Sequence, residues 1–217
     1  MKHRGKVDAG AHAVDPAALA IPHAEKGMRI GLFGGSFNPP HAGHLLVAET
    51  ARRRLGLDRI WWIVTPGNPL KDHGQLRPLG ERLAAVRRLA DGPHAAVTAF
   101  EAAHRIRYSA DTVALLRLRR PGIRFVWIMG ADSLASFHRW QDWRRIVAML
   151  PIAVVDRPGA SLASLSAPMA RYLEGYRLAE RDAAALPFRD PPAWVFLHGP
   201  RSPVSSTLIR KASGGAS

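Results

Sequence analysis

Two histidines, His41 and His44, have a spacing that suits the binding of a phosphate group. They are three residues apart, so on a helix they share one face. The apolar, Arg-terminated run at 45–55 predicts that helix, and the free N–H groups at a helix start attract anions. Gly34 and Gly35, just upstream, allow the backbone to turn sharply and approach a ligand closely. The stretch therefore predicts a phosphate site, although a metal-binding pair or two surface histidines would have the same spacing.

A second group of anion-binding residues stands near the end of the chain. Ser206 and Thr207 open the run at 203–210, which predicts a last helix, and Arg210 follows one turn later. Hydroxyl groups, N–H groups at a helix start and a guanidinium all donate hydrogen bonds to anions. Helix capping would explain one of the three hydroxyls, counting Ser205, but not all three together with an arginine.

Polar residues also follow two of the predicted strands. Lys71 and His73 come after the run Ile-Trp-Trp-Ile-Val, and Gly130 and Asp132 come after the run Phe-Val-Trp-Ile-Met. Ligands of open α/β sheets bind at the carboxyl ends of strands. Lys71 and His73 could therefore contact a phosphate, and Asp132 could accept hydrogen bonds from ribose hydroxyls or a ring amine. The other interpretations are a polar loop held by two prolines and, for Asp132, a helix N-cap.

A further set of candidates lies between these groups. Tyr108, Ser109 and Asp111 stand where another helix is predicted to start. Ser109 is predicted to cap that helix, and Asp111 in its first turn would interact favourably with the helix dipole. Trp140 and Trp143 are three residues apart, so one could stack on an aromatic ring while the other packs in the core. Burial of both rings is the alternative.

The elements that must position these residues alternate along the chain. The predicted strands are at about 29–33, 60–64, 95–100, 124–129, 152–156 and 193–197. The predicted helices are at about 41–55, 79–89, 111–118, 168–176, one that closes at 146–150 and one that begins at 203. This alternation predicts an α/β fold with a Rossmann-like, doubly wound parallel sheet and right-handed crossovers in a single domain. Residues 1–27 lack periodicity and predict a weakly ordered extension, which leaves 28–217 as the domain.

The composition narrows the class of protein. The 217 residues suit one domain with a sizeable core, and the absence of cysteine excludes disulfides, thiolate metal sites and a cysteine nucleophile. No apolar run has the length of a membrane span, and residues 1–27 lack a signal-peptide core, so we expect a cytoplasmic protein without membrane contact. The net charge of +14 fits nucleic acid, an anionic small molecule or only a basic surface. We expect no nucleic-acid partner, because the arginine clusters suit solvated helix faces and no interleaved aromatic–basic motif occurs.

The order of these stretches resembles that in the bacterial nicotinate-nucleotide adenylyltransferases, which belong to the nucleotidyltransferase superfamily with a His-x-Gly-His motif. The resemblance covers about residues 28–212. The first and last motifs are shared with sister transferases, whereas Tyr-Ser-x-Asp-Thr, and Gly-x-Asp-Ser-Leu with a following Trp, are typical of this family. The matching stretches are Gly34–His44, Pro66–His73, Tyr108–Thr112, Gly130–Leu134 with Trp140, Arg157–Gly159 and Val204–Arg210.

The resemblance implies a reaction in which ATP and nicotinate mononucleotide give deamido-NAD and pyrophosphate. The 5′-phosphate would attack the α-phosphorus of ATP in line, with Mg²⁺ carried by the ATP phosphates and no protein ligand assigned to the metal. The implied catalytic residues are His41, His44 and Arg210. The implied ATP-binding residues are Gly34, Gly35, Ser36, Phe37, His41, His44, Gly130, Asp132, Ser206, Thr207 and Arg210. The implied mononucleotide-binding residues are Asn38, Lys71, His73, Tyr108, Ser109, Asp111 and Trp140.

The resemblance also has departures and rivals. Asn38 stands where Asp is frequent in the family, which removes one negative charge, and Ser109 stands where Thr is common. A homo-oligomer is compatible with the family. The near alternative is a sister enzyme, either a pantetheine-phosphate adenylyltransferase or a transferase that prefers the nicotinamide nucleotide. The alternative from another class is a basic protein associated with nucleic acid, which rests on the charge alone.

Overall fold

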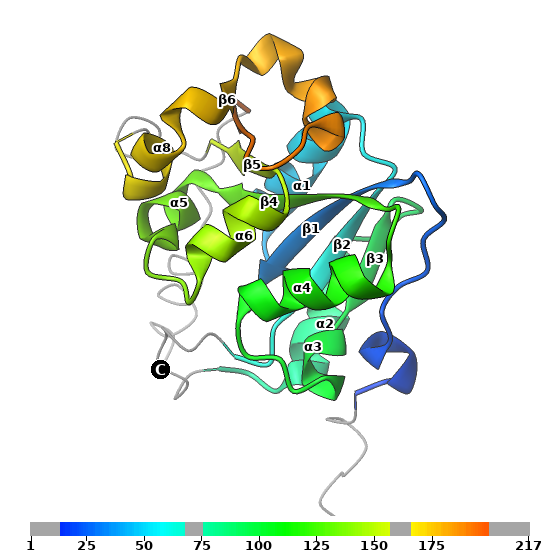
Figure 1. Ribbon diagram of the computed structural model, residues 1–217. Helices are drawn as coiled ribbons and strands as arrows, with labels where there is room; N and C mark the ends of the chain where they lie inside the picture. Colours follow the sequence, from blue (N-terminus) through cyan, green and yellow to red (C-terminus); the bar gives the residue numbers. More distant parts are fainter. Residues whose placement is uncertain (1–13, 68–75, 157–165, 200–217) are drawn as a thin grey trace, which may run out of the picture.

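The computed structural model describes residues 14–67, 76–156 and 166–199. A seven-stranded sheet runs through them in the order β3-β2-β1-β4-β5-β7-β6, and every neighbouring pair is parallel (Figure 1). The strand order reverses between β1 and β4, so the doubly wound α/β fold predicted from the sequence is confirmed. The strands are β1 (Arg29–Gly35), β2 (Arg59–Val64), β3 (Ala95–Thr98), β4 (Arg124–Gly130), β5 (Ile152–Val155), β6 (Arg177–Leu178) and β7 (Trp194–Leu197).

Helices cover both faces of this sheet. In the view of Figure 1, α4 and α6 lie in front of the strands and α1 lies behind them. The α-helices are α1 (Ala42–Leu55), α2 (Leu79–Leu89), α3 (Phe100–Ala103), α4 (Ser109–Arg119), α5 (Ala131–Phe137), α6 (Trp143–Met149) and α8 (Pro168–Tyr172). The 3₁₀ helices are η1 (Pro16–Leu19), η2 (Glu174–Tyr176) and η3 (Glu180–Phe188). No helix in the described ranges is long and apolar enough to cross a membrane.

Two apolar cores result, because successive residues of a strand point to opposite faces. Trp61 and Trp127 pack with α4, α5, α6 and α8 on one face, whereas Trp62 and Ile128 pack with α1 and α2 on the other. Strands β2 and β4 are buried on both faces, which explains their continuous apolar sequences. Gly31 in β1 allows the close packing on the α1 side, since a Cβ there would lie 2.4 Å from Ile128 Cδ1.

The third strand is shorter than the sequence predicted. The prediction ran to residue 100, whereas β3 ends at Thr98 and Phe100 begins α3. The hydroxyl of Thr98 accepts a hydrogen bond from the Phe100 N–H at 3.1 Å, which turns the chain out of the strand. The predicted helix at 168–176 is likewise divided, with α8 ending at Tyr172 and η2 following it. Five elements, η1, α3, α5, β6 and η3, were not predicted from the sequence.

Residues 14–27 lie against the domain, which the sequence pattern did not predict. The Ala18 carbonyl accepts hydrogen bonds from the Ala99 N–H at 2.7 Å and from the Thr98 hydroxyl at 3.1 Å. Ala18 itself is buried in the core on the α1 side. Asp15 caps η1 and forms an ion pair with Arg87, and both interactions lower the pKa of the Asp15 carboxyl. A short helix and these bonds therefore tie this segment to β3 and α2.

Candidate active site

The candidate site lies where the strand order reverses. Gly34 and Gly35 end β1, and Gly130 ends the adjacent strand β4. Ligands of doubly wound sheets bind in the crevice outside the carboxyl ends of the strands at this reversal. The fold therefore brings the glycines of two separate sequence motifs to neighbouring strand ends.

The loop from β1 to α1 is held in an unusual conformation by packing. Phe37 has a φ of 45°, a left-handed conformation that is costly for a bulky residue. Its ring is buried and packs edge-on against Phe33 at 5.5 Å and against the His44 ring at 5.1 Å. The Phe37 side chain thus anchors the loop to the core, and a contact between Phe37 and a nucleotide would come from the Phe37 backbone. Asn38 accepts a hydrogen bond at Oδ1 from the Arg77 N–H at 3.2 Å.

His41 and His44 cap the start of α1 reciprocally. The helix begins at Ala42, one residue later than predicted, so His41 is its N-cap residue, and His41 Nδ1 accepts a hydrogen bond from the Gly43 N–H at 3.1 Å. His44 Nδ1 accepts a hydrogen bond from the His41 N–H at 3.2 Å. The two rings lie 3.8 Å apart between centroids. An Nδ1 that accepts a hydrogen bond carries no proton, so each neutral ring has its proton on Nε2.

This arrangement suits an anion. Each ring in this tautomer offers an Nε2–H donor, and the positive end of the α1 dipole adds to the attraction. The first turn of α1 contains no acidic residue that would oppose a bound anion. The sequence predicted the phosphate role of the pair from its spacing, but not the reciprocal cap that fixes the ring nitrogens.

The structure corrects the predicted start of the helix at 111–118. Tyr108 is the N-cap residue and Ser109 is already helical, so Ser109 does not cap the helix as predicted. No side chain in the described chain caps this start. Tyr108 is 37% exposed, and Asp111 is exposed and lies 3.4 Å from Arg145 Nη1. The free N–H groups of a helix start remain suited to an anion.

A buried carboxyl, that of Glu101, contacts the first turn of α4. The Thr112 hydroxyl donates a hydrogen bond to Glu101 Oε1 at 2.5 Å. Burial raises the pKa of Glu101 to about 7, and the bond from Thr112 partly opposes that rise. Sequence reasoning treated Glu101 only as the end of a strand. An acidic residue directly after a buried apolar run was the signal that could have identified it.

Asp132 and Trp140 lie on the β4 side of the site. Gly130 is the N-cap residue of α5, so Asp132 stands at the second helical position, exposed, and the N-cap alternative for it is wrong. Trp140 is half-buried and meets Trp127 edge-on at 6.2 Å, whereas Trp143 is 9% exposed. The structure thus divides the two tryptophans as the spacing suggested, with Trp143 in the core and Trp140 accessible.

Several predicted site residues lie outside the described residues. These are Lys71, His73, Ser206, Thr207 and Arg210, together with the matching stretch Arg157–Gly159. Their roles stay predictions. In the ranges that the structure covers, no group of three or more His, Asp and Glu side chains could hold a metal ion.

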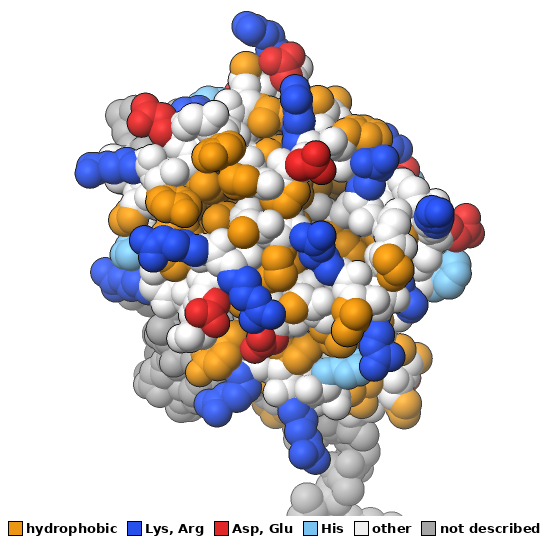
Figure 2. Space-filling model, viewed as in Figure 1, with side chains coloured by type: hydrophobic (Ala, Val, Ile, Leu, Met, Phe, Trp, Pro, Cys, Tyr) orange, Lys and Arg blue, Asp and Glu red, His pale blue; other side chains and the backbone are white. Residues whose placement is uncertain are grey.

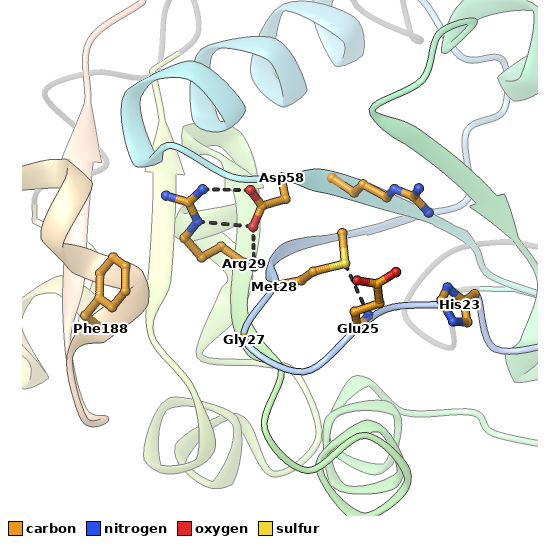
Figure 3. Close-up of a pocket in the computed structure, with 8 residues that line it drawn as sticks. His23, Glu25, Gly27, Met28, Arg29, Asp58 and Phe188 are labelled. Carbon is orange, nitrogen blue, oxygen red and sulfur yellow. Dashed lines mark hydrogen bonds and ion pairs between the residues drawn. The ribbon is translucent and has the colours of Figure 1, made fainter.

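A hollow of about 500 Å³ lies at the amino ends of the strands, opposite to the carboxyl ends that form the candidate site (Figure 3). Arg29 and Arg59, the first residues of β1 and β2, line it together with Asp58 and Phe188. Arg29 donates to both carboxylate oxygens of Asp58, at 3.1 Å and 2.6 Å, which lowers the pKa of Asp58 and raises that of Arg29. The hollow is therefore lined by a paired charge and is remote from the candidate site.

Comparison with known proteins identifies the class to which this α/β fold belongs. The model of the cytidylyltransferase-like family matches residues 32–212. The chain is 60% identical over 195 residues to a probable nicotinate-nucleotide adenylyltransferase of Mesorhizobium japonicum, covering 90% of this chain and 100% of the relative. It is 62% identical over 188 residues to the protein of the same name from Rhizobium meliloti, covering 87% of this chain and 100% of that relative.

The chain therefore belongs to the nicotinate-nucleotide adenylyltransferase family and is a nucleotidyltransferase. The fold agrees with a solved structure, the Plasmodium falciparum nicotinic acid mononucleotide adenylyltransferase complexed with NaAD. That likeness has a TM-score of 0.63 at 15% identity and covers 85% of this chain and 83% of the other. The same enzyme complexed with APC gives a TM-score of 0.60 at 14% identity, with the same coverage.

Proposed function

We propose that this chain transfers the adenylyl group of ATP to nicotinate mononucleotide, giving deamido-NAD and pyrophosphate in NAD biosynthesis. An oxygen of the 5′-phosphate of the mononucleotide forms a bond to the α-phosphorus of ATP. The bond from that phosphorus to the β-phosphate oxygen breaks, and pyrophosphate leaves. No covalent enzyme intermediate is needed, so the protein acts by positioning the substrates and stabilising charge.

The observation that carries this proposal is the reciprocal cap of His41 and His44. Because backbone N–H groups occupy both Nδ1 atoms, the Nε2–H groups are the donors that would meet phosphate oxygens. The reciprocal cap holds both rings at the helix start, so little reorganisation is required when charge develops on the departing phosphate. Mg²⁺ would be carried by the substrate, since it binds through ATP phosphate oxygens and water and the N–H donors of the histidines are no ligands for it.

The other residues take the roles that the family suggests. Gly34, Gly35 and the Ser36–Phe37 backbone would line the nucleotide, and Gly130 and Asp132 would hold the adenosine. Ser206, Thr207 and Arg210 would hold the β- and γ-phosphates, and Lys71 and His73 the mononucleotide phosphate. Support within the described chain comes from the adjacent ends of β1 and β4.

The choice of mononucleotide is assigned to the start of α4. The nicotinate carboxylate is an anion, and the N–H groups at this uncapped start, near Tyr108 and Ser109, would donate hydrogen bonds to it. The NH₂ group of nicotinamide would place a donor against these donors, which costs binding. Trp140 would stack on either ring and set no preference.

The test measures pyrophosphate release from ATP with each mononucleotide. We expect a kcat/KM for nicotinate mononucleotide at least roughly tenfold above that for nicotinamide mononucleotide, equivalent to about 1.4 kcal/mol. Trp140→Ala should lower both values and leave their ratio nearly unchanged. Equal use of the two mononucleotides would show a dual-specificity enzyme. Pyrophosphate release with phosphopantetheine, and not with a mononucleotide, would show a pantetheine-phosphate adenylyltransferase.

A further inference from the structure

Arg82, in the first turns of α2, is an arginine buried among backbone carbonyls. The residue is 2% exposed. Its Nη1 donates hydrogen bonds to the carbonyls of Ser36 and Thr65, both at 2.8 Å. Its Nη2 donates to the Pro66 carbonyl at 3.2 Å, and its Nε donates to the Arg77 carbonyl at 2.9 Å. One guanidinium therefore joins three separate backbone segments.

The segments that Arg82 joins surround the candidate site. Ser36 belongs to the loop between β1 and α1, and Thr65 and Pro66 follow the carboxyl end of β2. Arg77 precedes α2, and its N–H donates to Asn38 Oδ1, so its peptide groups are held by both the guanidinium and the loop. Burial lowers the pKa of Arg82, but an arginine stays protonated in a protein.

The bond to Ser36 has a consequence for the next residue. The Ser36 carbonyl and the Phe37 N–H belong to one trans peptide group, and the orientation of this group sets the φ of Phe37. Holding the carbonyl toward Arg82 therefore maintains the left-handed φ of 45° at Phe37. The N–H of the same group points the opposite way, away from the guanidinium. The conformation of the loop that would line the nucleotide thus depends on a side chain three elements away in the sequence.

We propose that Arg82 is a positioning residue for adenylyl transfer, which fixes the β1–α1 loop against the end of β2 without touching substrate. The inference rests on the proposed function. Lysine cannot replace the guanidinium, because a single ammonium has three donors at one point and cannot span four carbonyls around a planar group. A misplacement of about 1 Å in a site of this kind costs on the order of a hundredfold in rate.

The test compares Arg82→Lys with Arg88→Lys, the same substitution at an exposed arginine of the same helix. Turnover is measured per folded molecule, well below the melting temperature of each variant. We expect kcat of Arg82→Lys to fall at least tenfold while the KM values for both substrates change less than about threefold, and Arg88→Lys to match the wild type. Should the lysine variant not fold, Arg82→Gln removes the buried charge and gives the same comparison.

Amide hydrogen exchange supplies a second measurement that does not depend on activity. In Arg82→Lys the amides of residues 33–45 should exchange faster than in the wild type, whereas those of β5 and β7 should exchange at the wild-type rate, because only the hydrogen bonds around the β1–α1 loop are lost. Normal kcat per folded molecule, or a uniform rise in exchange over the whole chain, would overturn the positioning role and leave only a structural one. A wild-type protein that released no pyrophosphate with any mononucleotide would instead contradict the proposed function, and the exchange result would then show only whether Arg82 fixes the β1–α1 loop.

Discussion

The two histidines at the start of α1 have two separable tasks, a structural one at Nδ1 and a chemical one at Nε2. Asn at position 44 would retain an acceptor near the place of Nδ1 and would lose the donor at Nε2. We predict that His44→Asn keeps the cap to His41, with a stability change below about 1 kcal/mol. Its kcat should fall roughly 10²–10³-fold, the usual effect of removing one charge-stabilising donor.

The control is His44→Ala, which removes both nitrogens. This variant should lose the same activity and also about 1 kcal/mol of stability, measured by urea unfolding, because the His41 N–H loses its acceptor. Near-normal turnover in His44→Asn would show that the Nε2–H group is not used. A stability loss equal to that of His44→Ala would show that asparagine does not restore the cap.

Glu101 gives the protein a pH-dependent stability. Its pKa is about 7 in the folded chain against an ordinary value of 4.5, so the folded state binds the proton more tightly than the unfolded state. The stability linked to this proton is fully present below pH 4.5 and is lost as the pH rises through 7. The difference corresponds to about 3 kcal/mol at 1.36 kcal/mol per pKa unit.

We predict that Glu101→Gln abolishes this loss, because glutamine can still bond to Thr112 and carries no charge. Urea unfolding at pH 5 and pH 8 should show the wild type losing stability relative to the variant across that interval. Parallel pH curves for the two proteins would mean that Glu101 is already ionised at pH 5 in the folded state.

Sequence alone predicted some of these residues and not others, for a physical reason. The histidine pair and the tryptophan pair could be identified because local spacing places them on one helix face or in one loop. Arg82 and Glu101 act through burial, which depends on how distant segments pack. Arg82 did leave a trace, since it occupies the apolar face formed by Leu79, Leu83 and Val86, where a charged residue is out of place.

At the scale of elements, the packing of the side chains from β2 and β4 over β1 depends on Gly31. A Cβ at this position would lie 2.4 Å from Ile128 Cδ1 and 2.7 Å from Ile60 Cδ1, closer than carbon atoms can approach. We predict that Gly31→Ala destabilises the protein by about 1–3 kcal/mol through overpacking. Gly175→Ala is the matched control, because a Cβ there meets no atom within 4 Å. Urea unfolding midpoints that shift equally for both variants would contradict this account.

The boundaries of elements followed the sequence where packing and local preference agree. The bounds of α2 and β7 are close to the predicted ones, since apolar periodicity and flanking breakers coincide there. The start of α4 differs because the Tyr108 carbonyl accepts the first helical hydrogen bonds, from the Asp111 N–H at 3.0 Å and the Thr112 N–H at 3.2 Å, which makes Tyr108 the N-cap residue. Serine is a preferred N-cap residue, so the local pattern favoured Ser109 and could not show this start.

For the whole molecule, the charge of +14 does not form one continuous binding surface in the view of Figure 2. The Lys and Arg side chains there are spread between acidic and apolar groups. Part of the charge is paired, since Glu49 contacts Arg52 and Arg53, and Glu180 contacts Arg54. This distribution gives the nucleic-acid alternative no support beyond the net charge. The absence of a nucleic-acid partner stays a prediction, tested by retention on DNA at moderate salt.

The residues before Lys26 stabilise the domain through bonds to β3 and α2. A chain that begins at Lys26 lacks the Ala18 and Ala20 carbonyls, to which the buried Thr98 hydroxyl donates at 3.1 Å and 2.9 Å. It also lacks the Asp15–Arg87 ion pair, which is exposed and contributes little. We predict that this chain is about 1–3 kcal/mol less stable than one that begins at Val14, because buried groups of β3 lose their partners.

Activity should respond differently from stability. No candidate site residue lies in 14–25, so the chain that begins at Lys26 should keep the kcat and both KM values of the chain that begins at Val14 when measured well below its melting temperature. Thermal unfolding of the two chains, followed by circular dichroism, gives the stability difference, and pyrophosphate release gives the activity. Coincident melting curves would mean that the contacts of Ala18 and Ala20 add nothing to stability. A folded Lys26 chain without turnover would place the segment in the active site, because a purely stabilising contact cannot lower the turnover of molecules that remain folded.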